Sequence, residues 1–476
     1  MEEKRSFIFD VAWIKRGVAK ALPDKIKVEE QELKEIIQGE NETSDDETTD
    51  ANEEPMEEES ERIRLRGSNP DITAPEGLDK YGLEKYDEET GEKVNPMAGI
   101  AMFASPFEDP YITQHVDSDE EEEKEDFMIK PVDNLVAVAK IVKDEPSIEV
   151  YVFNEENDDW YLHHDYLLDA PPLCLASFSY DPGSENKKGN LLAVGTMDSV
   201  INVWDLDIVN AVEPVLSLGE SSLKKKSKNK KKKEKARRKR DGSAQGHTDA
   251  VLCLDWNSLS EHVIASGSAD ETVVLWDLDE AKATVILNNF GGMVQTMQWH
   301  PVEQAIILTG TRAGKVTMSD CRNVEAETPA EWNFGESVEI EKVLWDRFNP
   351  FCAYVCSDDG YLRYIDSRNT KTALFEALCH ENGTSSVSQS FTTKGLIATC
   401  GDTEFKIWKV AGNEMKSVYT HNANMGDLHT LKFSPDSGSV LIVGGEKEEM
   451  VRIYDIQKFE KVCEAFRATE EDAAME

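Results

Sequence analysis

"GHTDAVLCLDWNSLSEHVIASGSADETVVLWDL", residues Gly246–Leu278, is the stretch that decides the fold of this chain. It opens with Gly-His, continues as an alternating apolar run, passes through a Ser-Gly-Ser-x-Asp turn and ends in Trp-Asp. Alternation of apolar and polar residues is typical of strands with one buried face, and turn residues separate one strand from the next. The stretch therefore predicts one small sheet of short strands.

Units of the same kind recur along the chain. With Trp276 as the anchor, the equivalent positions are Phe153, Trp204, Ser319, Ile365, Trp408 and Tyr454. Successive anchors lie 51, 72, 43, 46, 43 and 46 residues apart, and the interval of 72 falls to 43 without the 29 residues 217–245. Repeats of about 40–45 residues are the period of propeller blades.

A second aromatic series keeps the same phase, because an aromatic residue closes an earlier strand of each unit. Its members are Trp13, Phe178, Trp256, Trp299, Trp345, Phe391 and Phe433. The Gly-His start and Trp-Asp end of the best copy resemble a WD40 blade. The sequence thus predicts an all-β fold, a seven-bladed WD40 β-propeller in which each sheet gains stability by stacking on its neighbours.

A long insertion separates the two halves of the first unit, since Trp13 lies 140 residues before Phe153. Twelve of the 22 residues 40–61 are acidic and none is basic, and eight of the ten residues 117–126 are acidic. Such segments bury too little apolar surface to offset the entropy of ordering. The expected organisation is a strand of blade one in 1–20, an acidic, mostly disordered insertion in 21–126, the propeller in 127–466 with a basic disordered loop in 220–245, and an acidic tail in 467–476.

Two features of the ring stay open at this point. The last blade is completed either by Lys461–Phe466 ("KVCEAF") alone or by pairing with the N-terminal strand. Ser319 and Ile365 stand where Trp is expected, so the fourth and fifth blades depart from the pattern, either by drift or because they form a site.

The best blade contains a His, a Ser and an Asp, which invites a catalytic reading. These residues occupy structural positions of a WD40 blade, so His247, Ser266, Asp270 and Trp276 are predicted to form a hydrogen-bonded structural tetrad that satisfies buried polar groups. The expectation is that the protein is not an enzyme.

Cofactor and metal sites are not expected either. His163, His164 and Asp165 are adjacent on a predicted strand, where neighbouring side chains point to opposite faces and cannot converge on one ion. The eight cysteines form no CxxC pairs, and Cys352 and Cys356 are the only close pair, so free buried thiols are expected rather than zinc. The glycine-containing turns lack phosphate-loop spacing.

One basic segment stands out in a chain of formal net charge −42. Residues Lys224–Arg240 ("KKKSKNKKKKEKARRKR") hold thirteen lysines and arginines. These are Lys224, Lys225, Lys226, Lys228, Lys230, Lys231, Lys232, Lys233, Lys235, Arg237, Arg238, Lys239 and Arg240. Such a run between two blades is predicted to be an extended loop that acts as a nuclear or nucleolar address, or as a sequence-indifferent contact to RNA or DNA phosphates.

The acidic tracts have more than one interpretation. They are either solvated spacers, or polyanions that bind basic partners such as histone tails, ribosomal proteins or assembly factors, or a cover for the chain's own basic loop. Ser44 and Ser118 precede acidic residues in the way that acidophilic kinases prefer, and are candidate phosphorylation sites that would deepen the negative charge.

Neither a signal peptide nor a membrane span is expected. The N-terminal residues contain no long apolar stretch, and no run of about 18 apolar residues occurs anywhere. A soluble intracellular protein without membrane partners is the expectation.

Several stretches, mostly outside the generic blade signature, resemble the periodic tryptophan protein 1 family, WD40 proteins of the nucleolus. They are "VAWIKRGVAK" (Val11–Lys20), "EDFMIKPVDNLVAVAK" (Glu125–Lys140), "EVYVFNEENDDWYLHHDYLL" (Glu149–Leu168), "VINVWDLDIVNAVEPVLSLG" (Val200–Gly219), the lysine-rich loop and "QGHTDAVLCLDWN" (Gln245–Asn257). The resemblance implies a role in ribosome biogenesis, in pre-rRNA processing and large-subunit assembly, with links to transcription and chromatin of the rRNA genes.

The sequence and the resemblance together favour a non-catalytic scaffold in the nucleus and nucleolus. Its propeller would bind protein partners in pre-ribosomal particles, its basic loop would address the chain and contact RNA, and its acidic insertion would hold basic proteins. A chromatin-associated histone-binding protein or chaperone is the first alternative. A ubiquitin-ligase substrate receptor is the second.

Overall fold

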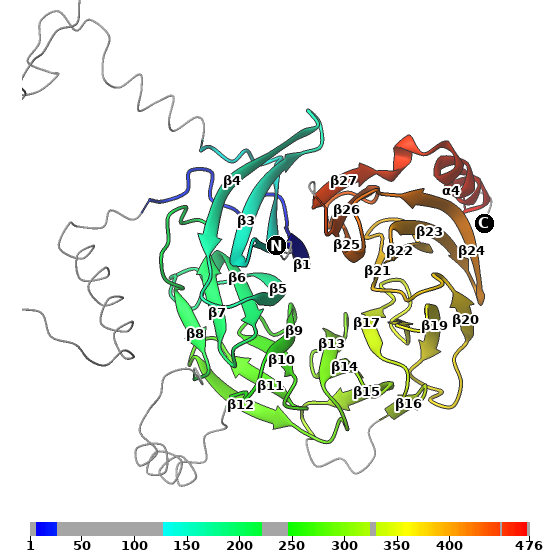
Figure 1. Ribbon diagram of the computed structural model, residues 1–476, viewed down its shortest axis with the longest axis horizontal. Coiled ribbons are helices and arrows are strands. Elements are labelled where there is room, and N and C mark those ends of the chain that lie inside the picture. The colour runs from blue at the N-terminus through cyan, green and yellow to red at the C-terminus, as the bar shows by residue number, and fades with distance from the viewer. Residues whose placement is uncertain (1–5, 26–126, 221–245, 324–329, 448–449, 474–476) are drawn as a thin grey trace, which may run out of the picture. The chain divides into compact units, whose positions relative to one another are not determined.

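A computed structural model describes residues 6–25, 127–220, 246–323, 330–447 and 450–473. Their strands form seven antiparallel sheets arranged around a ring (Figure 1), which confirms the predicted seven-bladed β-propeller. Blades one to three contain β1 (Ser6–Ile14), β2 (Asn134–Val142), β3 (Glu145–Asn154) and β4 (Asp159–Leu167); β5 (Pro172–Tyr180), β6 (Lys188–Thr196), β7 (Ile201–Asp205) and β8 (Leu216–Leu218); and β9 (Val251–Trp256), β10 (Val263–Ser268), β11 (Val273–Asp277) and β12 (Lys282–Leu287).

The remaining blades follow in chain order around the ring. They contain β13 (Val294–Trp299), β14 (Ile306–Thr311), β15 (Lys315–Asp320) and β16 (Ala330–Asn333); β17 (Ile340–Trp345), β18 (Cys352–Ser357), β19 (Tyr361–Asp366) and β20 (Phe375–Leu378); β21 (Ser386–Gln389), β22 (Leu396–Gly401), β23 (Glu404–Ala411) and β24 (Glu414–Asn422); and β25 (Leu428–Phe433), β26 (Val440–Gly445) and β27 (Val451–Asp455). A 3-10 turn, η4 (Ile456–Lys458), and the helix α4 (Glu460–Ala473) follow β27.

The two sequence series mark the same places in every blade. Each anchor, Trp276 on β11 among them, lies on the third strand of its sheet, and the second aromatic series ends the first, innermost strand. Trp13 and Phe178 lie one and two residues before the ends of β1 and β5, and Phe391 follows β21 by two residues. Apolar side chains of adjacent sheets pack face to face; Phe178 of blade two, for example, belongs to one buried cluster with Leu254 and Trp276 of blade three. Burying these faces is the main stabilising contribution to the ring.

The N-terminal strand closes the ring as the innermost strand of blade one. β1 pairs with β2, although the two are separated in sequence by the insertion, and packs between β5 and β25. Two contacts tie it to blade seven: Trp13 Nε1 donates to Lys432 O at 3.2 Å, and Lys432 Nζ lies 2.8 Å from Asp10 Oδ1.

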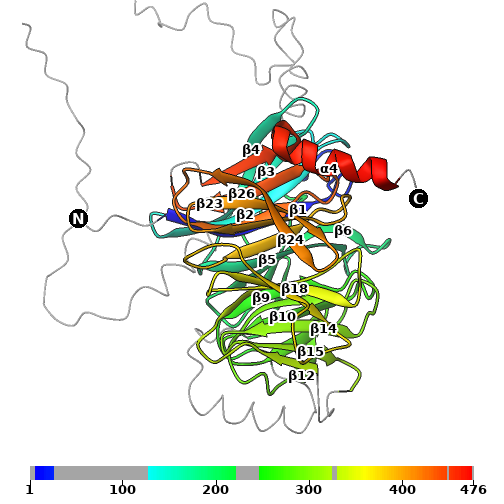
Figure 2. The same cartoon turned by 90° about the vertical axis from the view of Figure 1, so that its right-hand side faces the viewer.

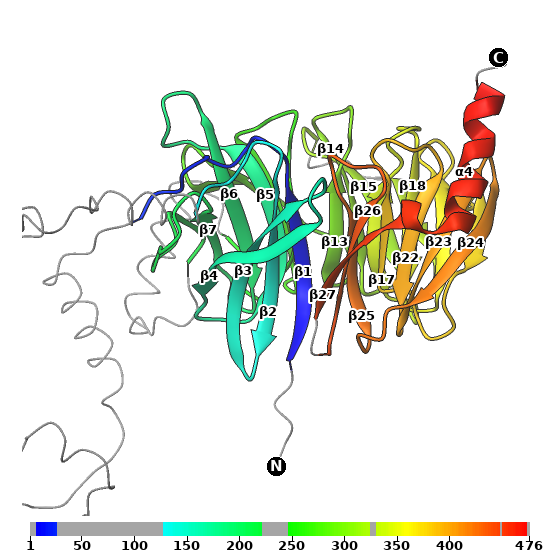
Figure 3. The same ribbon diagram turned by 90° about the horizontal axis from the view of Figure 1, so that it is seen from above.

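Neither proposed way of completing the last blade is correct. Lys461–Phe466 lies in α4, and the N-terminal strand pairs within blade one, so the described part of blade seven has three strands. Val462 and Phe466 are four residues apart, which suits one face of a helix, and they pack in a cluster with residues of blades six and seven. Figures 2 and 3 show α4 on the outside of the ring, beside β24.

The assigned domain borders shift where the structure describes them. Residues 21–25, assigned to the insertion, pack on the propeller. The backbones of Asp24 and Ile208 form an isolated parallel β-bridge, and Lys25 Nζ lies 3.9 Å from the ring centroid of Phe127. The two ends of the insertion therefore meet. Residues 467–473, assigned to the tail, continue α4. The rest of the insertion (26–126) and residues 221–245 of the basic loop lie outside the described residues.

A membrane-spanning helix was not expected from the sequence. Among the residues that the structure describes, no helix is both long and apolar enough to cross a bilayer.

Candidate functional site: the blade tetrads and the base of the basic loop

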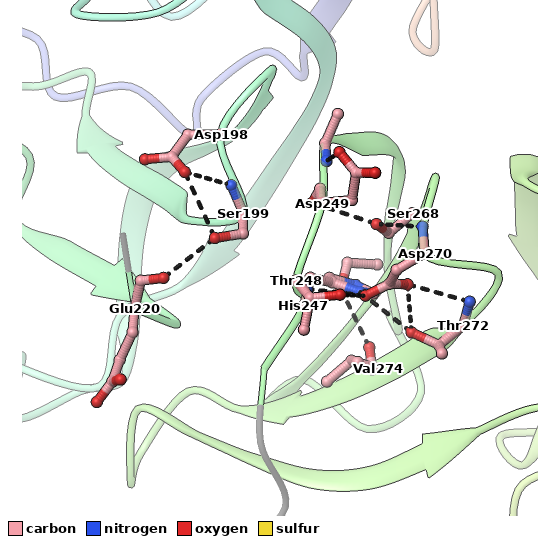
Figure 4. Close-up of polar contacts among 12 residues, drawn as sticks. Asp198, Ser199, Glu220, His247, Thr248, Asp249, Ser268, Asp270, Thr272 and Val274 are labelled. Atoms are coloured by element: carbon pink, nitrogen blue, oxygen red, sulfur yellow. Dashed lines mark hydrogen bonds and ion pairs between the residues drawn. The ribbon is translucent and has the colours of Figure 1, made fainter. Parts of the chain in front are cut away.

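The structure brings the four tetrad residues of blade three together, and Figure 4 shows two of them, His247 and Asp270, with their polar neighbours. His247 precedes β9, Ser266 lies on β10 and Trp276 on β11. Ser266 Oγ accepts a hydrogen bond from Trp276 Nε1 at 2.7 Å and lies 2.7 Å from His247 Nε2. The other nitrogen of the His247 imidazole, Nδ1, lies 3.2 Å from Asp270 Oδ2. Every buried polar group of the set thus has a partner within the blade.

The Asp270 carboxylate is held by several donors. Thr248 N donates to it at 2.9 Å and Thr272 Oγ1 at 2.6 Å, in addition to the contact with His247. Burial alone would raise the pKa of Asp270, but these hydrogen bonds outweigh it and hold the pKa below its usual range. The carboxylate is therefore a fixed anion that closes the turn before β9 rather than a proton acceptor for chemistry.

The tetrad also positions the base of the basic loop. Gly219 and Gly246 flank the loop, and a Cβ on Gly246 would lie 2.7 Å from Trp276 Cη2 and 3.3 Å from Gly219 Cα. Only glycine allows this close approach. Next to Gly219, the carbonyl of Glu220 accepts from Ser199 Oγ at 3.0 Å (Figure 4). Both ends of residues 221–245 therefore leave and re-enter the propeller at one place, against Trp276, at the seam of blades two and three.

The thirteen lysines and arginines of 224–240, Ser44 and Ser118 all lie outside the described residues. Their assigned roles remain predictions.

Blade six contains a second tetrad that the sequence reading missed. Thr399 Oγ1 accepts from Trp408 Nε1 at 2.9 Å and lies 3.0 Å from His380 Nε2. The signal was present, because His380 precedes Thr399 by 19 residues, the same spacing as His247 and Ser266.

The second tetrad lacks the carboxylate contact of the first. Asp402 accepts from Asn382 Nδ2 at 3.2 Å, and His380 Nδ1 is buried without a hydrogen-bond partner among the described residues. Burial, together with the nearby charge of Lys406, lowers the pKa of His380 to about 4. His380 is therefore neutral at physiological pH.

Blades two and five replace the tetrad in different ways. In blade two, Val194 occupies the position of Ser266, and Trp204 Nε1 is buried without a partner in the described part of the chain. In blade five, the anchor Ile365 is apolar, and buried Arg363 takes over the polar role: its guanidinium donates to Ser357 Oγ at 2.5 Å and pairs with Asp359. The departure at Ile365 therefore accompanies an alternative buried network.

The expectation that His163 and His164 point to opposite faces is wrong. The β3–β4 register shifts between Val150 and Tyr151, so that His163 sits in a bulge opposite no partner. The two Nδ1 atoms lie 2.7 Å apart, and His164 Nε2 lies 2.9 Å from the Tyr166 hydroxyl. Burial lowers the pKa of both histidines, that of His164 to about 3, so both are neutral and share one hydrogen-bonded chain.

The cysteines are free thiols, six of them buried. Burial raises the pKa of Cys253 and Cys400 to about 12, so these thiols stay protonated. Within the described ranges, no group of three or more His, Cys, Asp and Glu side chains is arranged to hold a metal ion.

Comparison with known proteins identifies the repeat. The model of the family "WD domain, G-beta repeat" matches residues 239–277, which include β9, β10 and β11 of blade three. Among solved structures, a chain of the mitotic checkpoint complex aligns with a TM-score of 0.50 at 16% identity, covering 68% of this chain and 84% of that one. At this identity the likeness shows the fold alone.

Curated relatives match nearly the whole chain. The periodic tryptophan protein 1 homolog of Drosophila melanogaster is 35% identical over 96% of this chain and 95% of its own length. Periodic tryptophan protein 1 of Saccharomyces cerevisiae is 27% identical over 96% of this chain and 89% of its own. The ribosome biogenesis protein WDR12 homolog of Drosophila yakuba is 24% identical over 42% of this chain and 44% of its own. With its seven-bladed ring and this full-length similarity, the chain belongs to the periodic tryptophan protein 1 family.

Proposed function

We propose that this protein is a non-catalytic WD40 scaffold in ribosome biogenesis, acting in the nucleolus in pre-rRNA processing and large-subunit assembly. The observation that carries the proposal is the match to periodic tryptophan protein 1 relatives along almost the full chain. The partial similarity to a protein named for ribosome biogenesis supports the same direction.

The geometry of the blades fits a scaffold. In the blade-three tetrad, the histidine, serine and aspartate all direct their hydrogen bonds at one another and at the adjoining turn. Although serine, histidine and aspartate follow one another in the order of a hydrolase triad, Ser266 is fully buried and its Oγ accepts from the Trp276 indole, so a substrate has no access to it. A rigid ring with many turns on its two faces instead offers surfaces for several protein partners.

The charged segments suit a particle made of RNA and basic proteins. The basic loop leaves the propeller from a fixed base at Gly219 and Gly246, which would present thirteen positive charges from one point. We propose that it serves as the nucleolar address and contacts rRNA phosphates, while the acidic insertion binds basic ribosomal proteins or assembly factors. Phosphorylation of Ser44 and Ser118 would strengthen the second role.

Partner recovery after gentle nuclear extraction, with and without RNase, tests the proposal. Large-subunit ribosomal proteins and pre-rRNA that co-purify in an RNA-dependent manner are the expected result. RNA-independent recovery of histones would favour the histone chaperone instead, and recovery of cullin-type ligase subunits would favour the substrate receptor.

The address is tested separately. Replacing the thirteen basic residues of 224–240 by Gln keeps the loop length and removes its charge, and should abolish nucleolar accumulation of the tagged chain. The matched control replaces Lys416 and Lys447, basic residues of other blades, by Gln and should accumulate normally. Unchanged nucleolar accumulation of the loop variant would contradict the assignment.

A further inference from the structure

The outer edge of blade seven has backbone groups without strand partners. Gly445 N donates to Met450 O at 2.8 Å and Ile456 N donates to Ser439 O at 3.0 Å, which fixes the alternation of the β26–β27 ladder. Between these two bonds, the N–H and C=O groups of Arg452 and Tyr454 point toward β26. The N–H and C=O groups of Val451 and Ile453 therefore point away from the sheet, and no backbone bond within the described residues engages them. We call these groups the blade-seven edge.

The other six blades carry a fourth strand at the equivalent place. The C-terminal helix does not occupy it in blade seven, because α4 packs against β24 of blade six, as Figures 1 and 3 show. Every residue of β27 is half-buried, whereas the fourth strand β24 has exposed residues at both ends. Its equivalent in blade three, β11, is covered by a fourth strand and has four buried residues of five, so β27 is less covered than that strand and has the hydrogen bonding of an edge.

A pocket lies beside this edge, at the seam between blades seven and one. It has a volume of about 240 Å³ and is lined on one side by Met450 and Val451 and on the other by residues of blade one, including Val138, Tyr151 and Trp160. The rings of Tyr151 and Trp160 stack with centroids 4.4 Å apart. Val451 and Ile453 face the same seam, since both pack against the buried cluster of blade one. The ion pair of Lys140 with Glu149 also lines the pocket, so an added strand would place every second side chain into a seam that is partly apolar and partly charged.

The C-terminal end of β27 lies beside a group of carboxylates. The turn between β3 and β4 presents the exposed carboxylates of Glu156, Asp158 and Asp159, and an ion pair of 3.5 Å between Lys458 Nζ and Asp158 Oδ2 places this turn beside the end of β27. Asp455, at that end, adds a further carboxylate. Four carboxylates against one lysine favour a cationic residue in whatever chain binds there.

We propose that the blade-seven edge is a docking site for an extended segment of a partner protein, which adds antiparallel to β27 as the fourth strand of the blade. The segment carries apolar residues at alternate positions, which enter the seam beside Val451 and Trp160, and a lysine or arginine at its N-terminal end, next to Asp455. Strand addition of this kind draws affinity from main-chain hydrogen bonds and selectivity from the pocket. The inference rests on the proposed scaffold role and names one kind of partner for it.

Amide hydrogen exchange at single-residue resolution on the full chain tests whether the edge is free. The amides of Val451 and Ile453 should exchange at least a hundredfold faster than those of Arg452 and Tyr454. In blade three, by contrast, all amides of β11 should be slow, because that strand is paired on both sides. Slow exchange at Val451 and Ile453 in the isolated protein would overturn the proposal: if independent of concentration, a segment of the same chain covers the edge, and if concentration-dependent, a second copy does.

Selection of a displayed library of 12-residue peptides against the full chain tests the partner. Enriched peptides should alternate apolar and polar residues after an initial lysine or arginine, and should slow the exchange of Val451 and Ile453. Ile453→Pro removes the outward N–H without removing a bond to β26 and should weaken binding at least tenfold. The control Thr420→Pro, at an exposed position of the edge strand β24, should bind as the parent does.

A second variant tests the site even if Ile453→Pro disturbs the fold of blade seven. Trp160→Ala opens the wall of the pocket and should also weaken peptide binding, while the Arg452 and Tyr454 amides stay slow. No enriched sequence, or binding that both variants leave unchanged, would refute the strand site. Such a failure would leave the recovery of pre-ribosomal partners unaffected, whereas loss of those partners with intact peptide binding would count against the ribosomal role alone.

Discussion

Replacing Ser266 by alanine should destabilise the propeller strongly for so small a change. Ser266 is fully buried, and its hydroxyl is the partner of both Trp276 Nε1 and His247 Nε2, each at 2.7 Å. The variant leaves these two buried groups without a partner, and each such loss costs about 1–3 kcal/mol. Part of the cost is recovered by relaxation, so we expect the free energy of unfolding to fall by about 2–4 kcal/mol.

Equilibrium urea unfolding of the full chain measures this loss, followed in parallel by tryptophan fluorescence and far-ultraviolet circular dichroism. Coincident curves establish a single transition before a free energy is extracted. Ser217→Ala is the matched control, because the Ser217 hydroxyl donates to Asn202 Oδ1 at an exposed position of blade two, and it should change stability by less than about 0.5 kcal/mol. A loss below about 0.5 kcal/mol for Ser266→Ala would refute the reading of the tetrad as a structural network.

Three further outcomes follow from the buried polar groups. Val194→Thr should stabilise the chain by up to about 1 kcal/mol in the same urea assay, because a hydroxyl at this position gives the unpartnered Trp204 indole N–H an acceptor, and a loss of stability would contradict the assigned equivalence with blade three. Burial raises the pKa of the Glu341 carboxyl from its ordinary 4.5 to about 7. The stability that the protonated carboxyl contributes is therefore fully present below pH 4.5 and is lost as the pH rises to about 7. Glu341→Gln should flatten this part of the stability–pH curve, and an unchanged slope would argue against a buried carboxyl. Asp359→Asn should cost about 3–5 kcal/mol in thermal or urea unfolding, because it leaves the guanidinium of Arg363 buried with a weakened counter-charge, and near-neutral behaviour would show that the pair is solvated.

The ring itself could be predicted from the sequence because its signal is repeated seven times. An anchor such as Trp276 fixes the third strand of its blade, and an aromatic such as Trp345 fixes the end of the first. Where one unit lacks its marker residue, the regular spacing of the other units still locates its strands. Even Ser319 and Ile365, which lack the aromatic ring, fall on the expected strand because spacing and not residue type locates them.

Features that occur once could not be predicted in the same way. Lys461–Phe466 contains apolar residues at spacings that suit a short strand or a helix, and its packing against blade six decides for the helix. The bulge that brings His163 onto His164 depends on the register of β3 with β4, which a period of two cannot reveal. The buried role of Arg363 arises from the turn that places Ser357 and Asp359 beside it.

The second tetrad shows a different kind of miss. His380, Thr399 and Trp408 were available from spacing, but the interval from Thr399 to Trp408 is one residue shorter than that from Ser266 to Trp276. One deletion between the second and third strands aligns His380, Thr399 and Trp408 with the blade-three set.

Depletion of the protein, with pre-rRNA intermediates followed over time, tests the central claim most directly. We predict that precursors of the large-subunit rRNAs accumulate, that free large subunits decline while small subunits persist, and that re-expression of the full chain restores both. An unchanged pre-rRNA profile after complete depletion would contradict a role in ribosome biogenesis.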